Sequence, residues 1–199
     1  MRLIIPLITL FFSLLVQPLA NAGCTNLNAR LNLSNPDSTY TDNGDWTITD
    51  NKTGLMWKKC PLGLDLDDCS RGAALSLNWS DAMRAAGSVN DDNGYTDWRI
   101  PNKNELNSLV EYACSLPAIN STFFPNGPTI ENAYGNYWTS TPLVDDGNKV
   151  WYINFQSGGP SLTNVSKDSR LFVRLVRGGV LTDEIPRVVQ PPNFGKTRN

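Results

Sequence analysis

The stretch Gly94-Tyr95-Thr96-Asp97-Trp98-Arg99-Ile100-Pro101 is the densest motif of this sequence. Asn102 follows it directly and has the signature of a helix N-cap, with Glu105 at the capping-box position. Arg99 lies close in sequence to two carboxylates, Asp97 and Glu105, so we expect a buried arginine that pairs with one of them in a structural contact. The motif therefore predicts an ion pair at the start of a helix.

Two amphipathic helices are predicted, one on each side of this motif, and each should bury one face on a sheet. The first begins after Asn78, carries Asp81 three residues after this cap and ends at Gly87. The second begins after Asn102 and ends before Pro117. Its apolar face consists of residues at helical spacing, namely Leu106, Leu109, Val110 and Ala113.

Strands are predicted on both sides of the helices. Residues 46–50 and 55–57 alternate or are apolar and flank an Asn-Lys-Thr-Gly turn, which is typical of a β-hairpin. Residues 137–140, 150–155 and 171–176 have the alternation of strands. Strands, then helices, then strands predict an α+β domain.

The first residues of the chain have the pattern of a signal peptide. Arg2 precedes an apolar run at residues 3–16, and Ala20-Asn21-Ala22 has the small-x-small form of a cleavage site. The apolar run is shorter than the ~20 residues that a membrane-spanning helix needs, so we expect export without a membrane span. The protein is then predicted to be secreted or periplasmic, or to lie at the cell surface.

The signal peptide is predicted at residues 1–22, and one globular domain at residues 23–179. Residues 180–199 contain several prolines and predict a poorly ordered C-terminal tail. A lipoprotein with an acylated Cys24 is the alternative, although Asn21 occupies the position where that signal requires an apolar residue.

Four cysteines in an exported chain predict two disulfides. Three pairings are possible, and the compact choice joins Cys60 to Cys69 and Cys24 to Cys114. In the chain-entropy description, the short loop contributes about 2.5 kcal/mol and the long loop about 4.5 kcal/mol. Neither spacing resembles a zinc site, and a chain without histidine would need all four thiols to bind zinc.

The composition excludes several classes of protein. The chain has no histidine, which excludes Ser-His-Asp and Cys-His mechanisms and an HExxH metal site. It also has no glycine-rich phosphate loop and no dinucleotide-binding fingerprint. Its formal charge of -2, with scattered Lys and Arg, argues against nucleic acid as a partner. Carboxylate-dependent glycoside hydrolysis is the enzymatic class that stays open.

Three loops carry Asp and Asn side chains next to a glycine. They are Asp42-Asn43-Gly44-Asp45, Asp91-Asp92-Asn93-Gly94 and Asp145-Asp146-Gly147-Asn148. Clustered carboxylate and amide oxygens can coordinate calcium, although the first two loops lack the full EF-hand spacing. Turns in which these side chains bond to their own backbone are the alternative. We expect no other cofactor.

Several short motifs, in order along the chain, are typical of one bacterial family. They are residues 50–57, 94–101, 117–120, 137–140 and 173–178. From about Tyr40 to Gly179, the chain resembles the family of the C-terminal domain of the Legionella collagen-like adhesin, a domain of unknown function in many exported bacterial proteins. Trp46 stands where that family usually has a glycine, and the collagen-like Gly-X-Y repeats of the namesake are absent.

The chain also has a more distant similarity, carried by residues 99–101, 111–113 and 172–177 together with Glu105. It resembles the sulfatase-modifying, formylglycine-generating group of C-type-lectin-like folds. This implies a C-type-lectin-like α+β domain, in which two helices pack on a twisted, mainly antiparallel sheet stapled by disulfides. The oxidase activity of that group is not implied, because its copper-binding cysteines lie near the C-terminus and this chain has no cysteine after Cys114.

The candidate ligand site is the loop Thr141–Lys149, which joins two predicted strands and is flanked by Trp138 and Trp151. Its polar side chains are Asp145, Asp146, Asn148 and Lys149. In C-type-lectin-like folds the comparable loop region holds the sugar and calcium, so the resemblance implies that the two aspartates and the asparagine are calcium ligands. A plain hairpin tip is the alternative. For a ligand bound elsewhere, we expect a basic face that uses Arg170 and Arg174.

Most of the tryptophans have a structural interpretation. Large aromatic side chains dominate protein cores, so we expect Trp57, Trp79, Trp98 and Trp151 to pack in the interior more readily than to bind a ligand. Trp151 therefore has two competing interpretations, as a core residue and as one flank of the candidate loop.

Three functional hypotheses follow. The first is an exported, non-catalytic binding module that recognises a carbohydrate, glycosaminoglycans included, or a surface protein in adhesion. The second is a structural or assembly component of a surface complex, which would expose a large apolar patch. The third is a glycosidase, which would need two acids about 5 to 10 Å apart in one cleft.

Overall fold

The computed structural model describes residues 23–24, 26–89, 94–127, 129–130, 133–156 and 162–178. The predicted signal peptide (1–22), the predicted tail (180–199) and the loop residues 91–93 lie outside this range. The helical elements are η1 (Asp37–Thr39), α1 (Trp79–Gly87) and α2 (Lys103–Ser108). The strands are β1 (Asn26–Leu27), β2 (Tyr40–Asp42), β3 (Thr47–Asp50), β4 (Met56–Lys58), β5 (Leu64–Asp65), β6 (Arg71–Gly72), β7 (Cys114–Ser115), β8 (Thr129–Ile130), β9 (Ala133–Tyr134), β10 (Asn136–Pro142), β11 (Lys149–Asn154), β12 (Leu162–Ser166) and β13 (Val176–Arg177).

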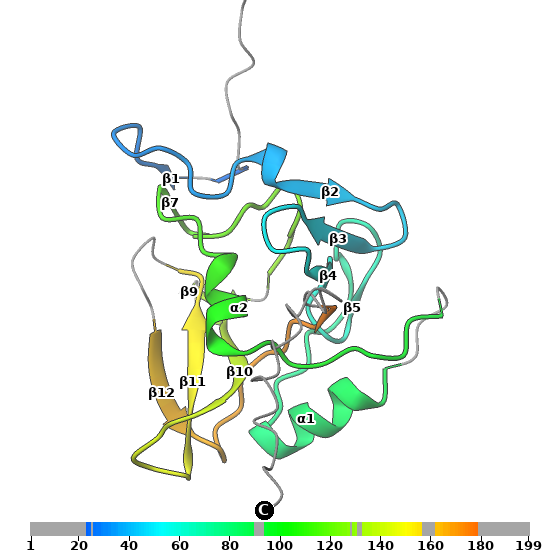
Figure 1. The fold of residues 1–199 in the computed structure, drawn as a ribbon, viewed down its shortest axis with the longest axis vertical. Coiled ribbons are helices and arrows are strands. Elements are labelled where there is room, and N and C mark those ends of the chain that lie inside the picture. The colour runs from blue at the N-terminus through cyan, green and yellow to red at the C-terminus, as the bar shows by residue number, and fades with distance from the viewer. Residues whose placement is uncertain are drawn as a thin grey trace, which may run out of the picture.

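These elements form an α+β fold of antiparallel sheets, as the sequence predicted (Figure 1). One sheet has four strands in the order β13-β4-β3-β2, and another has three in the order β10-β11-β12. Three further pairs, β1-β7, β5-β6 and β8-β9, form small two-stranded sheets. Helix α2 lies between the two larger sheets in the view of Figure 1, so the helix and both sheets share one interior.

The predicted first hairpin is confirmed as strands β3 and β4, which pair in antiparallel register. Asp50 closes the turn between them, because its Oδ1 accepts a hydrogen bond from the Lys52 amide at 2.9 Å. Gly54 has a φ of 70°, a left-handed conformation that glycine adopts without strain. The glycine of the predicted turn therefore has a geometric reason, and Asp50, predicted as the last strand residue, also closes the turn.

Trp46, the residue before β3, also has a left-handed backbone, with a φ of 63°. A residue with a side chain costs about 1–2 kcal/mol in this conformation, which explains why glycine would suit the position. The turn forms in spite of the substitution, and the indole ring is left 44% exposed.

The predicted strands at residues 137–140 and 150–155 are confirmed as β10 and β11. A third strand, β12, pairs with the other side of β11 and was not predicted. Its sequence is Leu-Thr-Asn-Val-Ser, so polar residues outnumber the apolar ones that would have indicated a strand.

The predicted strand at residues 171–176 is wrong for most of its length, because only Val176 belongs to a strand. All six residues of this segment are buried, so no side of it faces solvent. Phe172 and Val176 enter one hydrophobic cluster, whereas the apolar residues at 171, 173 and 175 enter another. The alternation is real, but it separates two interior clusters instead of an inner face from an outer one.

Helix α1 has the predicted bounds and cap. The Asn78 side chain accepts a hydrogen bond from the Asp81 amide at 2.8 Å, which satisfies one of the free amides of the first turn. Helix α2 begins at the predicted capping box, in which Asn102 and Glu105 each accept a bond from the backbone amide of the other.

Helix α2 is shorter than predicted, because it ends at Ser108 and does not include Val110 and Ala113. Val110 forms an antiparallel bridge with Ile119 instead. The next residue, Glu111, is fully buried, and its carboxylate accepts hydrogen bonds from the amides of residues 34, 35 and 113. These tertiary contacts replace the helical bonds of a longer α2.

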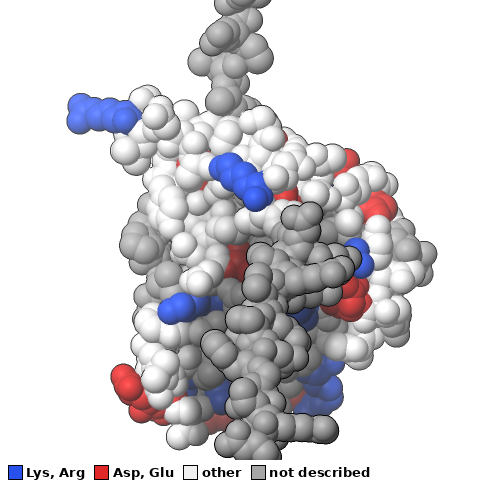
Figure 2. All heavy atoms as spheres, in the orientation of Figure 1, with Lys and Arg blue, Asp and Glu red and all other residues white. Residues whose placement is uncertain are grey.

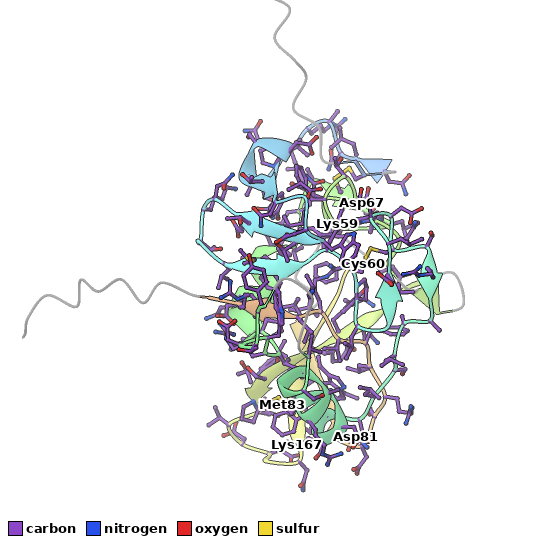
Figure 3. All side chains as sticks on the ribbon, turned by 90° about the vertical axis from the view of Figure 1, so that its right-hand side faces the viewer. Lys59, Cys60, Asp67, Asp81, Met83 and Lys167 are labelled. Atoms are coloured by element: carbon purple, nitrogen blue, oxygen red, sulfur yellow. A yellow bond between two sulfur atoms is a disulfide. The ribbon has the colours of Figure 1, made fainter. Side chains whose placement is uncertain are left out.

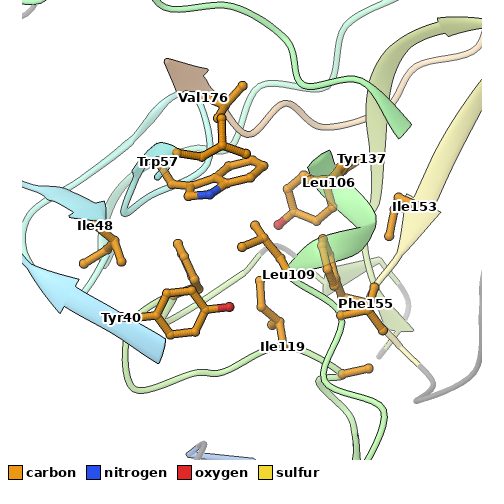
Figure 4. Packing of buried hydrophobic residues seen from close by; sticks show 14 of the residues in the cluster. Tyr40, Ile48, Trp57, Leu106, Leu109, Ile119, Tyr137, Ile153, Phe155 and Val176 are labelled. Atoms are coloured by element: carbon orange, nitrogen blue, oxygen red, sulfur yellow. The ribbon is translucent and has the colours of Figure 1, made fainter. Parts of the chain in front are cut away.

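Two hydrophobic clusters fill the interior. The first joins the four-stranded sheet, α2 and strands β10 and β11, with Trp57 fully buried in it (Figure 4). The second packs Trp98 and Ile100 against α1 and β10. Trp57 and Trp98 are therefore core residues, as expected, whereas Trp79 and Trp151 are only partly buried.

Both predicted disulfides are present. Cys24 bonds to Cys114 with Cα atoms 5.7 Å apart, and Cys60 bonds to Cys69 with Cα atoms 5.4 Å apart. The first bond fixes the N-terminal arm beside β7, with which β1 also pairs. Among the described residues, no helix has the length and apolar character needed to cross a membrane.

Candidate functional site

The predicted ligand loop, residues 141–149, forms the tip of the hairpin between β10 and β11, and we call it the hairpin tip (Figure 1). Asp146 Oδ1 accepts a hydrogen bond from the Asn148 amide at 3.0 Å, and this bond lowers the pKa of Asp146. Asp146 Oδ2 also lies 3.4 Å from Lys149 Nζ. Asp146 thus bonds to its own turn, as the alternative interpretation of this loop describes.

The two tryptophans beside the hairpin tip do not lie together. Trp138 offers no stacking face, because it is fully buried and its Nε1 donates to the Leu77 carbonyl at 2.8 Å. Trp151 is partly buried, and Lys103 Nζ lies 5.0 Å from the centre of its ring. The sequence could not separate these residues, because alternation along a strand does not say which face is covered.

The carboxylates of another candidate calcium loop are engaged by protein groups. Asp42 Oδ2 lies 2.8 Å from Lys59 Nζ, and Asp45 Oδ1 accepts a hydrogen bond from the Thr47 amide at 3.1 Å. Within the described ranges, no three or more Asp, Glu, Cys or His residues form a group that could hold a metal. Calcium binding at Asp145, Asp146 and Asn148 remains a prediction.

The expected basic face of Arg170 and Arg174 is not present. Arg170 is exposed and donates to the Ser76 carbonyl, but Arg174 is only 2% exposed. Arg174 is buried because it lies in the segment that crosses between the two hydrophobic clusters. On the face shown in Figure 2, Lys and Arg side chains are scattered and do not gather over one element.

Hydrogen bonds in the interior satisfy some of the Arg174 guanidinium nitrogens but not all of them. Nη1 donates hydrogen bonds to the carbonyls of Lys59 at 2.7 Å and Lys58 at 3.1 Å. The guanidinium carbon lies 4.9 Å from the ring centre of Phe124 and 5.7 Å from that of Tyr137. Nε is buried without a hydrogen-bond partner, and no carboxylate of the described residues pairs with this arginine.

Burial determines the pKa values of this group and its neighbour. Burial lowers the pKa of the Arg174 guanidinium, and the nearby Tyr137 hydroxyl partly counteracts this effect. Burial also raises the pKa of Tyr137 to about 12. At neutral pH the pair therefore consists of a cation and a neutral phenol.

Arg174 lines a cavity of about 490 Å³, which we call the Arg174 cavity. Most of its wall comes from the irregular segment 117–127, and the rest from β10, from the residue that follows β11 and from the segment 171–176. The lining residues are Pro117, Ile119, Ser121, Phe124, Pro125, Asn126, Gly127, Tyr137, Phe155 and Arg174. Tyr137 and Phe155 meet edge to face with ring centres 5.4 Å apart, and Figure 4 shows both side chains on the same side of the first cluster. The cavity thus combines aromatic and other apolar side chains with the polar residues Ser121 and Asn126 and with one buried cation.

A second buried cation, Lys59, has a different environment. It is 4% exposed, and its ammonium group contacts the carboxylates of Asp42 and Asp67. Figure 3 shows Lys59 and Asp67 facing one another next to Cys60. This cation is neutralised by the protein itself.

Arg99, the predicted structural arginine, is paired as expected. Its Nη1 and Nη2 each lie 2.8 Å from one oxygen of Glu105, and Nη2 also donates to the Gly178 carbonyl at 2.9 Å. Its side chain is 41% exposed, so this ion pair lies at the surface and not in the interior, where it was expected. Asp97 pairs with Arg177 instead.

Residues 46–177 of the chain match the sequence model of a known protein family, which is described as the Lcl C-terminal domain. The chain belongs to the Lcl C-terminal domain family. This Lcl domain includes both α-helices, the hairpin tip and every residue that lines the Arg174 cavity. Strands β1 and β2 precede the match, and no curated protein matches the chain.

Two parts of the Arg174 cavity were not predicted from the sequence. The aromatic and proline residues at 123–125 were not assigned to any element, because they follow neither a helical nor a strand period. Arg174 was predicted at the surface, although it interrupts the apolar run Phe172-Val173-Arg174-Leu175-Val176. A single charge inside a continuous apolar run is the signal that could have indicated a buried cation.

Proposed function

We propose that this Lcl domain is an exported, non-catalytic binding module that acts in adhesion by recognising carbohydrate at the cell surface or in the periplasm. Membership of a family associated with surface adhesins and the two disulfides support this proposal. The observation that carries it is the Arg174 cavity, whose aromatic walls and single cation are suited to hold a ligand. A C-type-lectin-like arrangement of the sheets is part of the same proposal.

The composition of the cavities favours binding over carboxylate chemistry. A glycosidase needs two carboxyl groups about 5 to 10 Å apart around its substrate. The lining of the Arg174 cavity contains no Asp or Glu, and that of a smaller cavity of about 120 Å³ contains only Asp65. Neither of these cavities brings together the pair of acids that hydrolysis requires.

A glycan array with the purified, oxidised chain tests the proposed function. We expect binding to a subset of glycans that contain acidic sugars, because the cavity presents one cation that no carboxylate of the described residues pairs with. An array without any signal above background would contradict carbohydrate recognition.

A triple variant on the same array separates the two candidate positions. Replacing Asp145, Asp146 and Asn148 together by Ala removes the polar groups of the hairpin tip but leaves both hydrophobic clusters intact. Loss of binding would place the ligand at the hairpin tip. Retained binding is the result that we expect for a ligand in the Arg174 cavity.

An assembly role has one observation in its favour. Trp46 and Leu66 are 44% and 38% exposed, and both line the smaller cavity of about 120 Å³. Exposed apolar side chains around a hollow are typical of a surface that contacts another protein. A blank glycan array, combined with self-association in sedimentation experiments that Trp46→Ser abolishes, would favour this role over carbohydrate binding.

A further inference from the structure

We propose that the Arg174 cavity binds a carboxylate carried on a six-membered ring, such as an acidic sugar or an aromatic acid. This inference rests on the proposed function, because it names the chemical class of ligand for the same cavity. It differs from the sequence prediction, which placed the ligand at the hairpin tip.

The positive charge of Arg174 has no carboxylate partner among the described residues. A buried cation in a folded protein is normally paired with an anion, since removing a charge from water is costly. Lys59 follows this rule with two carboxylates. Arg174 is more deeply buried, at 2% exposure, and among the described residues it has two backbone carbonyls, two aromatic rings and the hydroxyls of Tyr137 and Tyr40 nearby, but no carboxylate partner. An anion in the cavity would supply the missing half of an ion pair.

The geometry of the Arg174 guanidinium favours a carboxylate. The carbonyls of Lys58 and Lys59 occupy Nη1, while Nε has no partner. The edge that carries Nε therefore remains for a ligand, while the Tyr137 side chain is hydrogen-bonded to the same guanidinium. A planar carboxylate matches one such edge with two parallel hydrogen bonds. A doubly charged phosphate would fit less well, because the cavity lining contains no second cation.

The wall of the Arg174 cavity favours a ligand with a ring. Phe124 and Tyr137 contact the guanidinium and also line the cavity, so a ring lying on them would bring its substituent close to Arg174. Phe155 and Ile119 extend the apolar surface. The volume of about 490 Å³ lies within the range of about 300–1,000 Å³ typical of small-molecule sites. A ring with one carboxylate suits both the walls and the cation.

Matched pairs of small probes test the proposal on the purified, oxidised chain. Benzoate and benzamide have almost the same shape but differ in charge, and methyl glucuronide and methyl glucoside form the corresponding sugar pair. In titrations followed by NMR, we expect at least one acid to bind about tenfold or more tightly than its neutral partner, because charge-assisted hydrogen bonds are the stronger ones. Binding of the sugar acid would indicate a glycan as the source, and binding of benzoate alone would indicate a free aromatic acid. Equal binding of acid and neutral probe, or no binding of any probe, would overturn the proposal.

Variants locate the bound probe. Arg174→Lys keeps the charge but loses the planar fork, so the acid should bind about tenfold more weakly. Ser121→Phe places a ring at the cavity wall without changing Arg174 and should abolish binding even if the Arg174 variant does not fold. Ser88→Phe makes the same change at an exposed position at the end of α1 and should leave the affinity unchanged. Unchanged affinity in Ser121→Phe would overturn the assignment of the acid to this cavity.

The outcome also separates this inference from the proposed function. A blank glycan array with a probe that Ser121→Phe displaces would leave the cavity assignment intact and contradict carbohydrate recognition. A positive array that Ser121→Phe does not affect would support carbohydrate recognition and contradict the cavity as its site.

Discussion

Two buried cations in this domain lie next to each other but are balanced in different ways. Lys59 contacts the carboxylates of Asp42 and Asp67, beside the disulfide of Cys60. Arg174 donates to the backbone carbonyl of the same lysine and has no carboxylate partner among the described residues. One ion pair is complete within the chain, whereas the other cation lines an open cavity.

The difference separates a structural charge from one available for binding. A cation with two carboxylates gains little from a ligand, because its field is already cancelled. A cation held by carbonyls, rings and a neutral hydroxyl keeps its field, and the low dielectric of its surroundings strengthens that field. The most informative experiments therefore change one of the two cations at a time.

Arg174→Ala should have the largest effect on stability. The substitution removes two hydrogen bonds and the contacts with two aromatic rings, and it enlarges a cavity, so we expect a loss of about 3–5 kcal/mol in the free energy of unfolding. Urea unfolding followed by tryptophan fluorescence measures this loss. A loss below about 1 kcal/mol would mean that the arginine is not integral to the core.

Lys59→Met should cost less, about 1–2 kcal/mol, although the lysine is nearly as buried. The reason is that its partners, Asp42 and Asp67, are 38% and 79% exposed and can regain water when the ammonium is removed. The same urea experiment compares the two variants directly. A larger loss for Lys59→Met than for Arg174→Ala would reverse the ranking that the structure predicts.

The pH dependence of Lys59→Met sharpens the comparison further. Burial opposes ionisation of both partners, but the hydrogen bond and charge between them raise the pKa of Lys59 above 10.5 and lower that of Asp42 below 3.8. A carboxyl group with a lowered pKa stabilises the fold above its unfolded value, and this contribution is lost as the pH falls through the folded pKa.

We therefore expect the melting-temperature difference between wild type and Lys59→Met to be constant at neutral pH and to shrink below about pH 4. It should also shrink as the pH rises from the normal lysine pKa through the raised pKa of folded Lys59, where the ammonium loses its proton. Arg174→Ala provides the control, because no carboxylate in the described part of the chain pairs with that residue, so its effect should not shrink in acid. Parallel acid profiles for the two variants would contradict the assignment of partners.

Arg99→Lys should have the smallest effect, about 0.5–1 kcal/mol, because this pair lies partly in solvent. The lysine would keep the charge but lose the two-pronged contact with Glu105 and the bond to the Gly178 carbonyl. Calorimetry of the two proteins measures the shift in melting temperature. An unchanged melting temperature would refute a structural role for this ion pair.

Local signals in the sequence predicted the fold where one segment alone determines the structure. The first hairpin, α1 and the start of α2 each depend on a cap or a turn residue, and their positions were correct. The end of α2 and the segment 171–176 were not, because their backbone bonds go to distant segments. Such bonds cannot be read from a periodic pattern, since the alternation at 171–176 is present but does not say whether the segment joins a sheet.

The candidate site was less predictable than the fold. Polar loops such as the hairpin tip attract a functional interpretation, yet Asp146 uses its oxygens to close its own turn and to pair with Lys149. The Arg174 cavity, by contrast, joins residues from four separate parts of the chain, between Pro117 and Arg174. Only the folded structure brings them together.

The disulfide between Cys24 and Cys114 has a mechanical consequence. The two cysteines are separated by 90 residues, so at about 3.3–3.6 Å per residue the bond withholds about 300 Å of extended chain from any pull on the N-terminal arm. Tension entering at that arm passes directly to β7 and bypasses β2, β3 and β4. A pulled molecule therefore keeps residues 25–113 out of the force-bearing path while the disulfide is intact, whereas its reduced form would extend through them.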